Sequence, residues 1–190
     1  MVRYQKENAE KCKVMFMNMI KKWRKKRRDR IYEGPCIDGG TRISYDTDAP
    51  KEIISGTLVK LSCRYSTLSL IDECEIPAGD YKFTAIREND GAGCTAECIR
   101  GSLGGKKISR KLPCEVLDRI AALIKEHGIE SLNGRYYKVS GLPDFYGASI
   151  DAEYESGETL YCYNNQDPII PIEFAKELYR IFGMADGGDE

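Results

Sequence analysis

The body of the chain alternates apolar and polar side chains with the period of two that a half-buried β-strand requires. Over residues 57–65, one face collects the apolar side chains and the other collects lysine, serine and arginine. Residues 81–88 alternate in the same way after the turn-forming sequence Pro-Ala-Gly-Asp. Further strands are predicted at 94–100, at 107–111, at about 135–140, and as a hairpin over 147–163 that turns on Ser156 and Gly157.

Two later segments repeat apolar side chains every three or four residues, which predicts amphipathic helices. The first begins at Pro113 and ends before Gly128, and the second runs from Pro171 to Phe182. Each follows a predicted hairpin and has a glutamate two residues after its proline, which suggests a duplicated β-β-α unit. Together these elements predict an α+β fold, in which an antiparallel sheet of about six strands has two helices packed on one face.

A further amphipathic helix is predicted near the N-terminus, from about residue 9 to residue 27. Its apolar stripe consists of Met15, Phe16, Met19, Ile20 and Trp23. Its C-terminal half carries a cluster of cations: Lys21, Lys22, Arg24, Lys25, Lys26, Arg27 and Arg28. Such a helix fits three uses, namely a helix docked on a domain or in an oligomer, an anchor on an anionic membrane surface, or an arm that binds nucleic acid.

The charge distribution separates this helix from the rest of the chain. Residues 1–32 have a net charge of +9, from twelve basic and three acidic residues, whereas the remaining residues have −10. An acidic body would be repelled by phosphates, so nucleic acid is the less favoured partner. We expect a basic helix or arm at 1–32, a linker or irregular flank at 33–52, one α+β domain at 53–183, and a frayed acidic tail at 184–190.

Tyrosine is the aromatic residue that the chain uses most, with twelve copies against five of phenylalanine. A turn centred on Ser156 and Gly157 would place Tyr154, Tyr161 and Tyr163 together on one packed face of the hairpin. The carboxylates of the first hairpin strand would then form the opposite, solvated face. Because a tyrosine ring packs while its hydroxyl stays in water, we expect these three tyrosines to form a ligand or partner surface.

The eight cysteines and the single histidine offer little catalytic chemistry. Cys94 and Cys98 would lie about 13 Å apart on a strand, too far to share a metal ion. His127 ends a helical stripe, so it is expected to cap the helix or lie partly buried rather than act as a base. We therefore predict no catalytic residues, no metal site and no cofactor.

The length of 190 residues is enough for a core without disulfides. The sequence contains no apolar run long enough for a membrane span and no secretory signal, and the cysteines are expected to be reduced. These features predict a cytoplasmic protein, with membrane association through its basic helix as an alternative.

A resemblance to other proteins rests on residues 142–158, on the Asn164-Asn-Gln sequence that comes after them, and on the final helix. Over about 53–183 the chain resembles small uncharacterised bacterial α+β proteins with an extended hairpin before a C-terminal helix. The resemblance implies a bacterial origin and no particular activity.

The sequence favours a non-catalytic module that binds a protein partner or a second copy of itself, through its tyrosine-bearing sheet or its N-terminal helix. The first alternative is a peripheral membrane protein anchored by that helix. The second is a thiol- or metal-dependent enzyme that uses Cys94, Cys98 and His127.

Overall fold

The computed structural model describes residues 41–68, 75–141 and 146–185. All of these belong to the second of the two units into which the chain divides, Cys36–Glu190. The elements are β1 (Thr41–Tyr45), β2 (Leu58–Ser66), β3 (Gly79–Glu88), β4 (Gly91–Gly101), β5 (Lys107–Leu112), α2 (Glu115–Glu126), the 3-10 helix η1 (Ile129–Leu132), β6 (Arg135–Val139), β7 (Ala148–Tyr154), β8 (Thr159–Asn164) and α3 (Ile172–Ile181).

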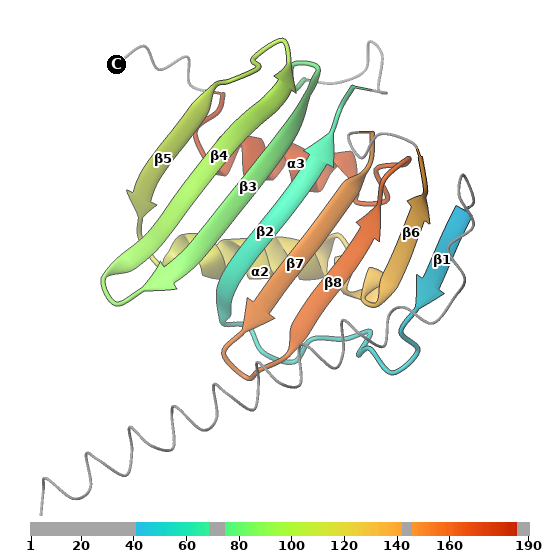
Figure 1. Cartoon of the computed structure of the whole chain (residues 1–190). Helices are drawn as coiled ribbons and strands as arrows, with labels where there is room; N and C mark the ends of the chain where they lie inside the picture. Colours follow the sequence, from blue (N-terminus) through green and yellow to red (C-terminus); the bar gives the residue numbers. More distant parts are fainter. Residues whose placement is uncertain (1–40, 69–74, 142–145, 186–190) are drawn as a thin grey trace, which may run out of the picture. The chain divides into compact units, whose positions relative to one another are not determined.

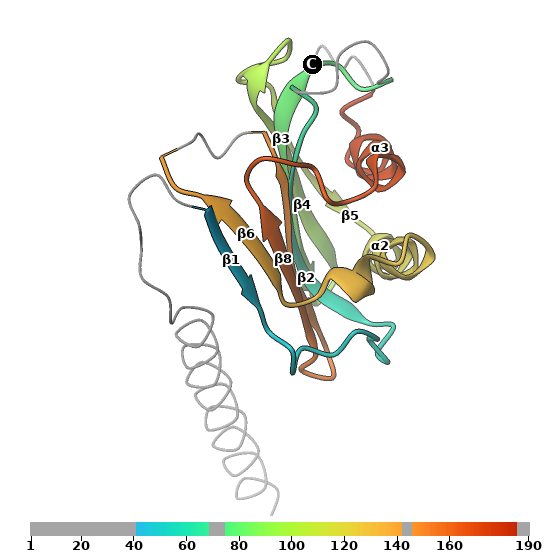
Figure 2. The same cartoon turned by 90° about the vertical axis from the view of Figure 1, so that its right-hand side faces the viewer.

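The eight strands form one sheet in the order β1-β6-β8-β7-β2-β3-β4-β5. Every neighbouring pair is antiparallel except β6 and β8, which run parallel. Helices α2 and α3 lie on the same side of the sheet (Figure 2). The described part of the chain places no helix or strand over the other side, which faces the viewer in Figure 1 and is called the open face below.

The expected antiparallel sheet of about six strands is wrong, because the sheet has eight strands and is mixed. Residues 41–45 form the edge strand β1 inside a segment that we expected to be a linker or irregular flank. Helices α2 and α3 each follow an antiparallel hairpin, β4–β5 before α2 and β7–β8 before α3, but the strands that precede the two hairpins are arranged differently. Before α2 the strands follow one another as a meander, whereas before α3 strand β6 lies beside β8 instead of its sequence neighbour β7. The N-terminal helix of the prediction lies outside the described residues.

The core forms where the apolar side of the strand alternation meets the two helices. On β2 and β3 the register pairs Cys63 with Phe83 and Tyr65 with Tyr81, and all four side chains are buried. Phe83 also packs against Phe182 after α3, with ring centroids 5.4 Å apart. Full burial of one such side chain stabilises the fold by about 1.5–3 kcal/mol.

The parallel junction between β6 and β8 has only two register pairs in its ladder, and buried asparagines extend it. Asn133, just before β6, donates from Nδ2 to the carbonyl oxygens of Pro50 (2.8 Å) and Thr159 (2.9 Å). Its Oδ1 accepts a hydrogen bond from the backbone N–H of Tyr161 at 2.9 Å. One side chain therefore joins the chain before β2, the start of β6 and strand β8.

A second buried asparagine, Asn165, closes the other end of this junction. The backbone N–H of Val139 donates to its Oδ1 at 2.9 Å, and its Nδ2 donates to the carbonyl oxygen of Val139 at 3.1 Å. The side chain thus supplies the donor and the acceptor that a neighbouring strand would supply. Gly147 lets its own backbone lie close to the backbone of Asn164, since a Cβ at this position would lie 1.8 Å from the carbonyl oxygen of Asn164.

Candidate functional site

The open face is the candidate functional surface because it carries the polar half of the alternation of the strands. Residues paired across neighbouring strands share a face, so the register defines its members. They are Ser44, Tyr136, Lys138, Thr159, Tyr161, Tyr163, Ser149, Asp151, Glu153, Lys60, Ser62, Arg64, Lys82, Thr84, Ile86, Thr95, Glu97, Lys107, Ser109 and Lys111.

Three partly buried tyrosines gather on one half of this face. The parallel pairing of β6 with β8 places Tyr136 beside Tyr163, and their rings stack with centroids 5.0 Å apart and an interplanar angle of 17°. Tyr161 follows on the same side of β8, two residues earlier. Stacked rings of this kind contribute about 0.5–1.5 kcal/mol beyond the area they bury. The stacked rings of Tyr136 and Tyr163, with Tyr161 beside them on β8, form an amphipathic surface.

The structure separates Tyr154 from the two tyrosines that were expected beside it. Tyr154 lies on the helix-covered face and is buried, whereas Tyr161 pairs with Asp151 on the open face. The cause is the length of the turn, which contains three residues, 155–157, and ends in Gly157 with φ +86°. A two-residue turn would have put Tyr154 with Tyr161, and one extra residue moves it to the other face.

Tyr136 belongs to the cluster but was not among the predicted site residues. Its partner strand β8 lies far along the sequence, so the local pattern does not show which of the adjacent Tyr136 and Tyr137 faces the other tyrosines. The register answers this, because Tyr137 pairs with Asn164 and therefore lies on the helix-covered side.

Charges of both signs surround the tyrosines on the open face. Across the centre of the sheet, Lys60 Nζ lies 3.4 Å from Glu153 Oε1. Arg64 donates two hydrogen bonds to the fully buried Asp80 carboxylate, at 2.8 and 2.6 Å. By contrast, Lys82 is exposed and forms no ion pair with any described residue. The face therefore combines neutralised pairs with cations that are available to a partner.

The cysteines on the strands are packed as small apolar groups. Cys63, Cys94, Cys98 and Cys162 are buried and free, on the helix-covered side of the sheet. Burial raises the pKa of Cys94 to about 11 and that of Cys162 to about 12, and it also raises the pKa values of Cys63 and Cys98. Thiols with raised pKa values are poor nucleophiles and poor metal ligands at neutral pH. These four buried thiols therefore give no support to the thiol-enzyme alternative.

His127 and Glu158 make contacts that stabilise the fold. The His127 ring lies at the end of α2 with its centroid 6.1 Å from that of Phe174. Glu158 accepts hydrogen bonds from the backbone N–H groups of Ile54 (3.0 Å) and Ser55 (2.9 Å) and from the Ser156 hydroxyl (2.7 Å). These hydrogen bonds lower the pKa of the Glu158 carboxyl. No group of described side chains has the composition of a metal site.

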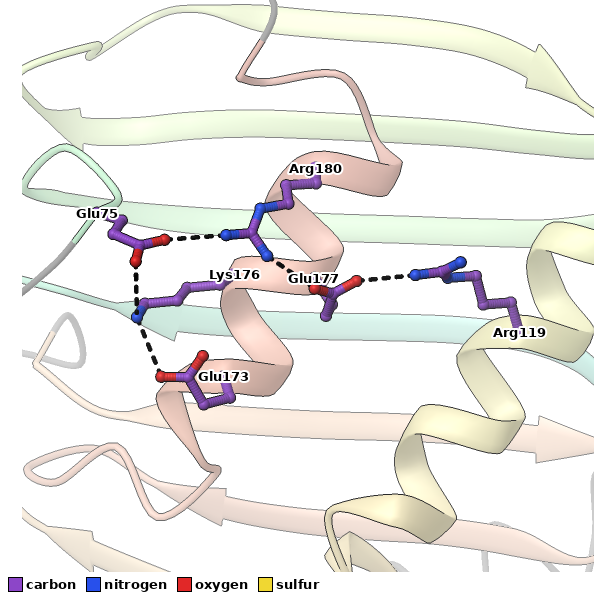
Figure 3. Close-up of polar contacts among 6 residues, drawn as sticks. All are labelled: Glu75, Arg119, Glu173, Lys176, Glu177 and Arg180. Carbon is purple, nitrogen blue, oxygen red and sulfur yellow. Dashed lines mark hydrogen bonds and ion pairs between the residues drawn. The ribbon is translucent and has the colours of Figure 1, made fainter.

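The outer side of the helices carries an ion network in which the charges balance (Figure 3). Glu177 on α3 contacts Arg119 of α2 at 3.0 Å and Arg180 at 2.8 Å, and the Arg119 hydrogen bond is the main reason that its pKa is lowered. Arg180 also reaches Glu75 at 2.9 Å, before β3. These pairs connect three segments and leave no excess of either sign, so we regard this side as structural.

The predicted partner or membrane contacts at 15–28 lie outside the described residues. Among the described residues, no helix combines the length and the apolar character needed to cross a membrane. The chain matches no protein-family model, no curated protein and no solved structure.

Proposed function

We propose that this chain is a non-catalytic binding module that holds a protein partner on the open face of its sheet. The observation that carries the proposal is the cluster of Tyr136, Tyr161 and Tyr163 on the polar face of the sheet, opposite the side on which α2 and α3 pack. Tyrosine is enriched at protein interfaces, because its ring buries a large area at a low cost in side-chain entropy while its hydroxyl can bond to polar groups.

The charges around the cluster favour a protein over a nucleic acid as the partner. Lysines on β2, β3 and β5 share the face with carboxylates on β4 and β7, so the face has no continuous basic stripe. A phosphate backbone binds to a surface with an excess of cations. Mixed charges around aromatic side chains are typical of the rim and centre of a protein interface.

We also propose a reducing compartment, the cytoplasm, as the place of action. Five free cysteines among the described residues support this, since disulfides are rare where glutathione keeps thiols reduced. Anchoring to a membrane by residues 12–30 stays an alternative for the N-terminal region. It would show as salt-sensitive binding to anionic vesicles that is lost when residues 1–32 are deleted.

Site-specific photo-crosslinking tests the binding face in cells that express the full-length chain. A benzophenone amino acid replaces Tyr161 on the open face, or Glu126, which is exposed on α2, as the matched control. We expect protein adducts from position 161 and none from position 126. The adducts should disappear when Tyr163→Ser is added, because that change removes the stacked neighbour. Equal adducts from both positions, or none from position 161, would contradict the proposal.

A further inference from the structure

Strand β5 forms one edge of the sheet, and no described element lies beyond it (Figure 1). All of its residues are exposed or half-buried. An edge strand presents unpaired backbone groups, which another chain can use as a template for pairing. We infer that β5 binds an acidic, extended segment of another protein, which adds to the sheet as a further strand.

The register with β4 shows which backbone groups of β5 are unpaired. The N–H of Cys98 donates to the carbonyl oxygen of Lys106 at 2.9 Å, one position beyond the paired register of the two strands. Successive residues of a strand direct their N–H and C=O groups to opposite edges, so alternate residues, beginning with Lys106, pair with β4. The groups that point away from the sheet belong to Lys107, Ser109 and Lys111.

A side-chain contact agrees with this assignment. Thr95 of β4 and Ser109 of β5 are opposite each other, and their hydroxyl oxygens lie 3.2 Å apart. Antiparallel neighbours come closest at positions where the two residues do not exchange backbone hydrogen bonds. The N–H and C=O groups of Ser109 therefore face outward, where an added strand would meet them.

The side chains along this edge are mainly cationic. Lys107 and Arg110 are exposed, and neither forms an ion pair with any described residue. Lys111 lies 2.5 Å from Asp90 and 3.5 Å from Glu88, so its end of the strand is closer to neutral. The uncompensated cations thus lie at the start and middle of β5, where the carboxylates of a partner would complement them.

The same cations argue against a second copy of this chain as the added strand. Two β5 strands related by a two-fold axis at Ser109 would set Lys107 of each copy opposite Lys111 of the other. Like charges directly opposite each other destabilise a strand pair. An acidic strand gains at the positions where a second copy loses, so charge selects the partner.

The helix-covered side of β5 defines the remaining positions of the segment. Ile108 and Leu112 are half-buried and pack against the core. An added strand would place alternate side chains beside them, and β-branched apolar residues suit a half-buried sheet surface. The expected segment therefore carries apolar residues opposite these two and carboxylates opposite Lys107 and Arg110.

The peptide Val-Thr-Glu-Thr-Val-Glu-Ser, blocked at both ends, has this pattern when it pairs antiparallel with β5. Fluorescence anisotropy of the labelled peptide measures its binding to the full-length protein. The control peptide Val-Thr-Lys-Thr-Val-Lys-Ser reverses the charge, and we expect the acidic peptide to bind at least about tenfold more tightly. No binding at about 1 mM, or equal binding of the two peptides, would overturn the inference.

Charge variants tie the binding to β5, because residues 1–32 carry a net charge of +9 and attract the same peptide. Lys107→Glu should weaken binding by about tenfold or more, since it places like charges opposite each other. The matched control Lys125→Glu makes the same change on the exposed side of α2 and should alter the affinity by less than about twofold. Equal affinities for the two variants would place the peptide elsewhere and overturn the inference.

A proline variant tests the backbone edge. Ser109→Pro removes an outward N–H at a position where an edge strand tolerates proline, so it should abolish binding. Ser109→Ala keeps the N–H and should bind as the wild type does. A folded Ser109→Pro protein that still binds would overturn the inference. If this variant does not fold, Lys107→Glu decides.

Amide hydrogen exchange, followed by NMR on the full-length chain with and without the acidic peptide, tests the strand pairing itself. We expect exchange to slow several-fold at the three outward-facing residues, because the peptide then accepts hydrogen bonds from their N–H groups. The N–H groups of Ile108 and Arg110, which face β4, should change little. Binding without protection of the outward N–H groups would contradict strand addition.

The inference goes beyond the proposed function and does not depend on it. Strand β5 is at the opposite end of the sheet from β6 and β8, which carry the tyrosine cluster. Absence of adducts from position 161 would remove the proposed function and leave the peptide results untouched. Failure of the peptide experiments would remove this inference and leave the tyrosine surface in place.

Discussion

The two halves of the sheet are held together by different interactions. Strands β2 to β5 form a meander in which each strand pairs with its neighbour in sequence, and their apolar sides pack against the helices. On the other side of the centre, β6 meets β8 through a two-position parallel ladder that buried asparagines complete. One half of the sheet therefore depends on packing distributed over many side chains, whereas the other depends on a few polar side chains.

The candidate site lies in the second half. Tyr136 reaches Tyr163 only because β6 lies parallel beside β8, and Asn133 and Asn165 hold this arrangement at its two ends. A polar network of this kind is strong when every member has its partner and costly when one is removed. The same asparagines that stabilise the edge of the sheet therefore position the tyrosines.

The largest expected effect is the loss of packing in the meander. Phe83→Ala removes a buried ring that contacts Phe182, so we expect the free energy of unfolding to fall by about 3–5 kcal/mol. Denaturant unfolding measures the change. Ile86→Ala, on the open face of the same strand and half exposed, is the control and should cost less than about 1 kcal/mol. Equal losses for the two variants would contradict the assignment of faces.

The next effect is confined to the other half. Asn133→Ala leaves the carbonyls of Pro50 and Thr159 and the N–H of Tyr161 without this partner, so we expect a loss of about 2–4 kcal/mol. Hydrogen exchange should rise first in β6 and β8 and much less in β3 and β4. Ser131→Ala, which removes an exposed hydrogen bond nearby, serves as the control. A uniform rise across the sheet would remove the distinction between the halves.

A smaller effect is expected where the β7–β8 turn holds the chain before β2. Glu158→Gln weakens the hydrogen bonds to Ile54 and Ser55, and because water competes there we expect a loss of about 0.5–1 kcal/mol at neutral pH. The pKa of Glu158 is lowered in the folded state, so its contribution is present above the ordinary value of 4.5 and is lost as the pH falls through the lowered value. The difference between variant and wild type should thus shrink in acid. Glu155→Gln, which removes an exposed charge from the same turn, is the control and should cost less than about 0.5 kcal/mol at neutral pH.

The smallest effect concerns a buried hydroxyl. The Tyr154 hydroxyl is buried and has no hydrogen-bond partner among the described residues, so Tyr154→Phe should leave stability unchanged or raise it by up to about 1 kcal/mol. Tyr81→Phe is the matched comparison, since the Tyr81 hydroxyl donates to the carbonyl oxygen of Pro77 at 2.6 Å. Tyr81→Phe should lower the free energy of unfolding by about 1 kcal/mol, as measured by thermal unfolding. A clear loss for Tyr154→Phe would mean that its hydroxyl has a partner.

The sequence predicted what depends on local pattern. The alternation over 57–65 marks β2, which the structure has at Leu58–Ser66, and the helical stripes lie close to α2 and α3. The sequence did not predict β1, because five residues between turn-forming segments carry too little alternation to be distinguished from a linker. The parallel β6–β8 contact joins segments far apart in sequence, and no local pattern records such a pairing.

The candidate site shows the same division between local and distant information. The richness in tyrosine pointed to the hairpin, and Tyr161 and Tyr163 do lie on the open face. Tyr154 was placed with them because a turn of two residues was assumed, and the third residue of the turn reversed its face. Only the register of β6 with β8 shows that Tyr136 belongs to this cluster. Composition thus indicates that a tyrosine surface exists, and the pairing of strands decides which tyrosines form it.

Hydroxyl-radical footprinting of the full-length protein inside cells and after purification tests the central claim most directly, because it reports the accessibility of single tyrosines. If the open face is the contact surface, oxidation of Tyr161 and Tyr163 should be several-fold lower in cells than in the purified protein. Tyr45, which is exposed and pairs with Arg135 on the opposite side of the sheet, should be oxidised to the same extent in both. Protection of Tyr45 with unchanged oxidation of Tyr161 and Tyr163 would contradict the account.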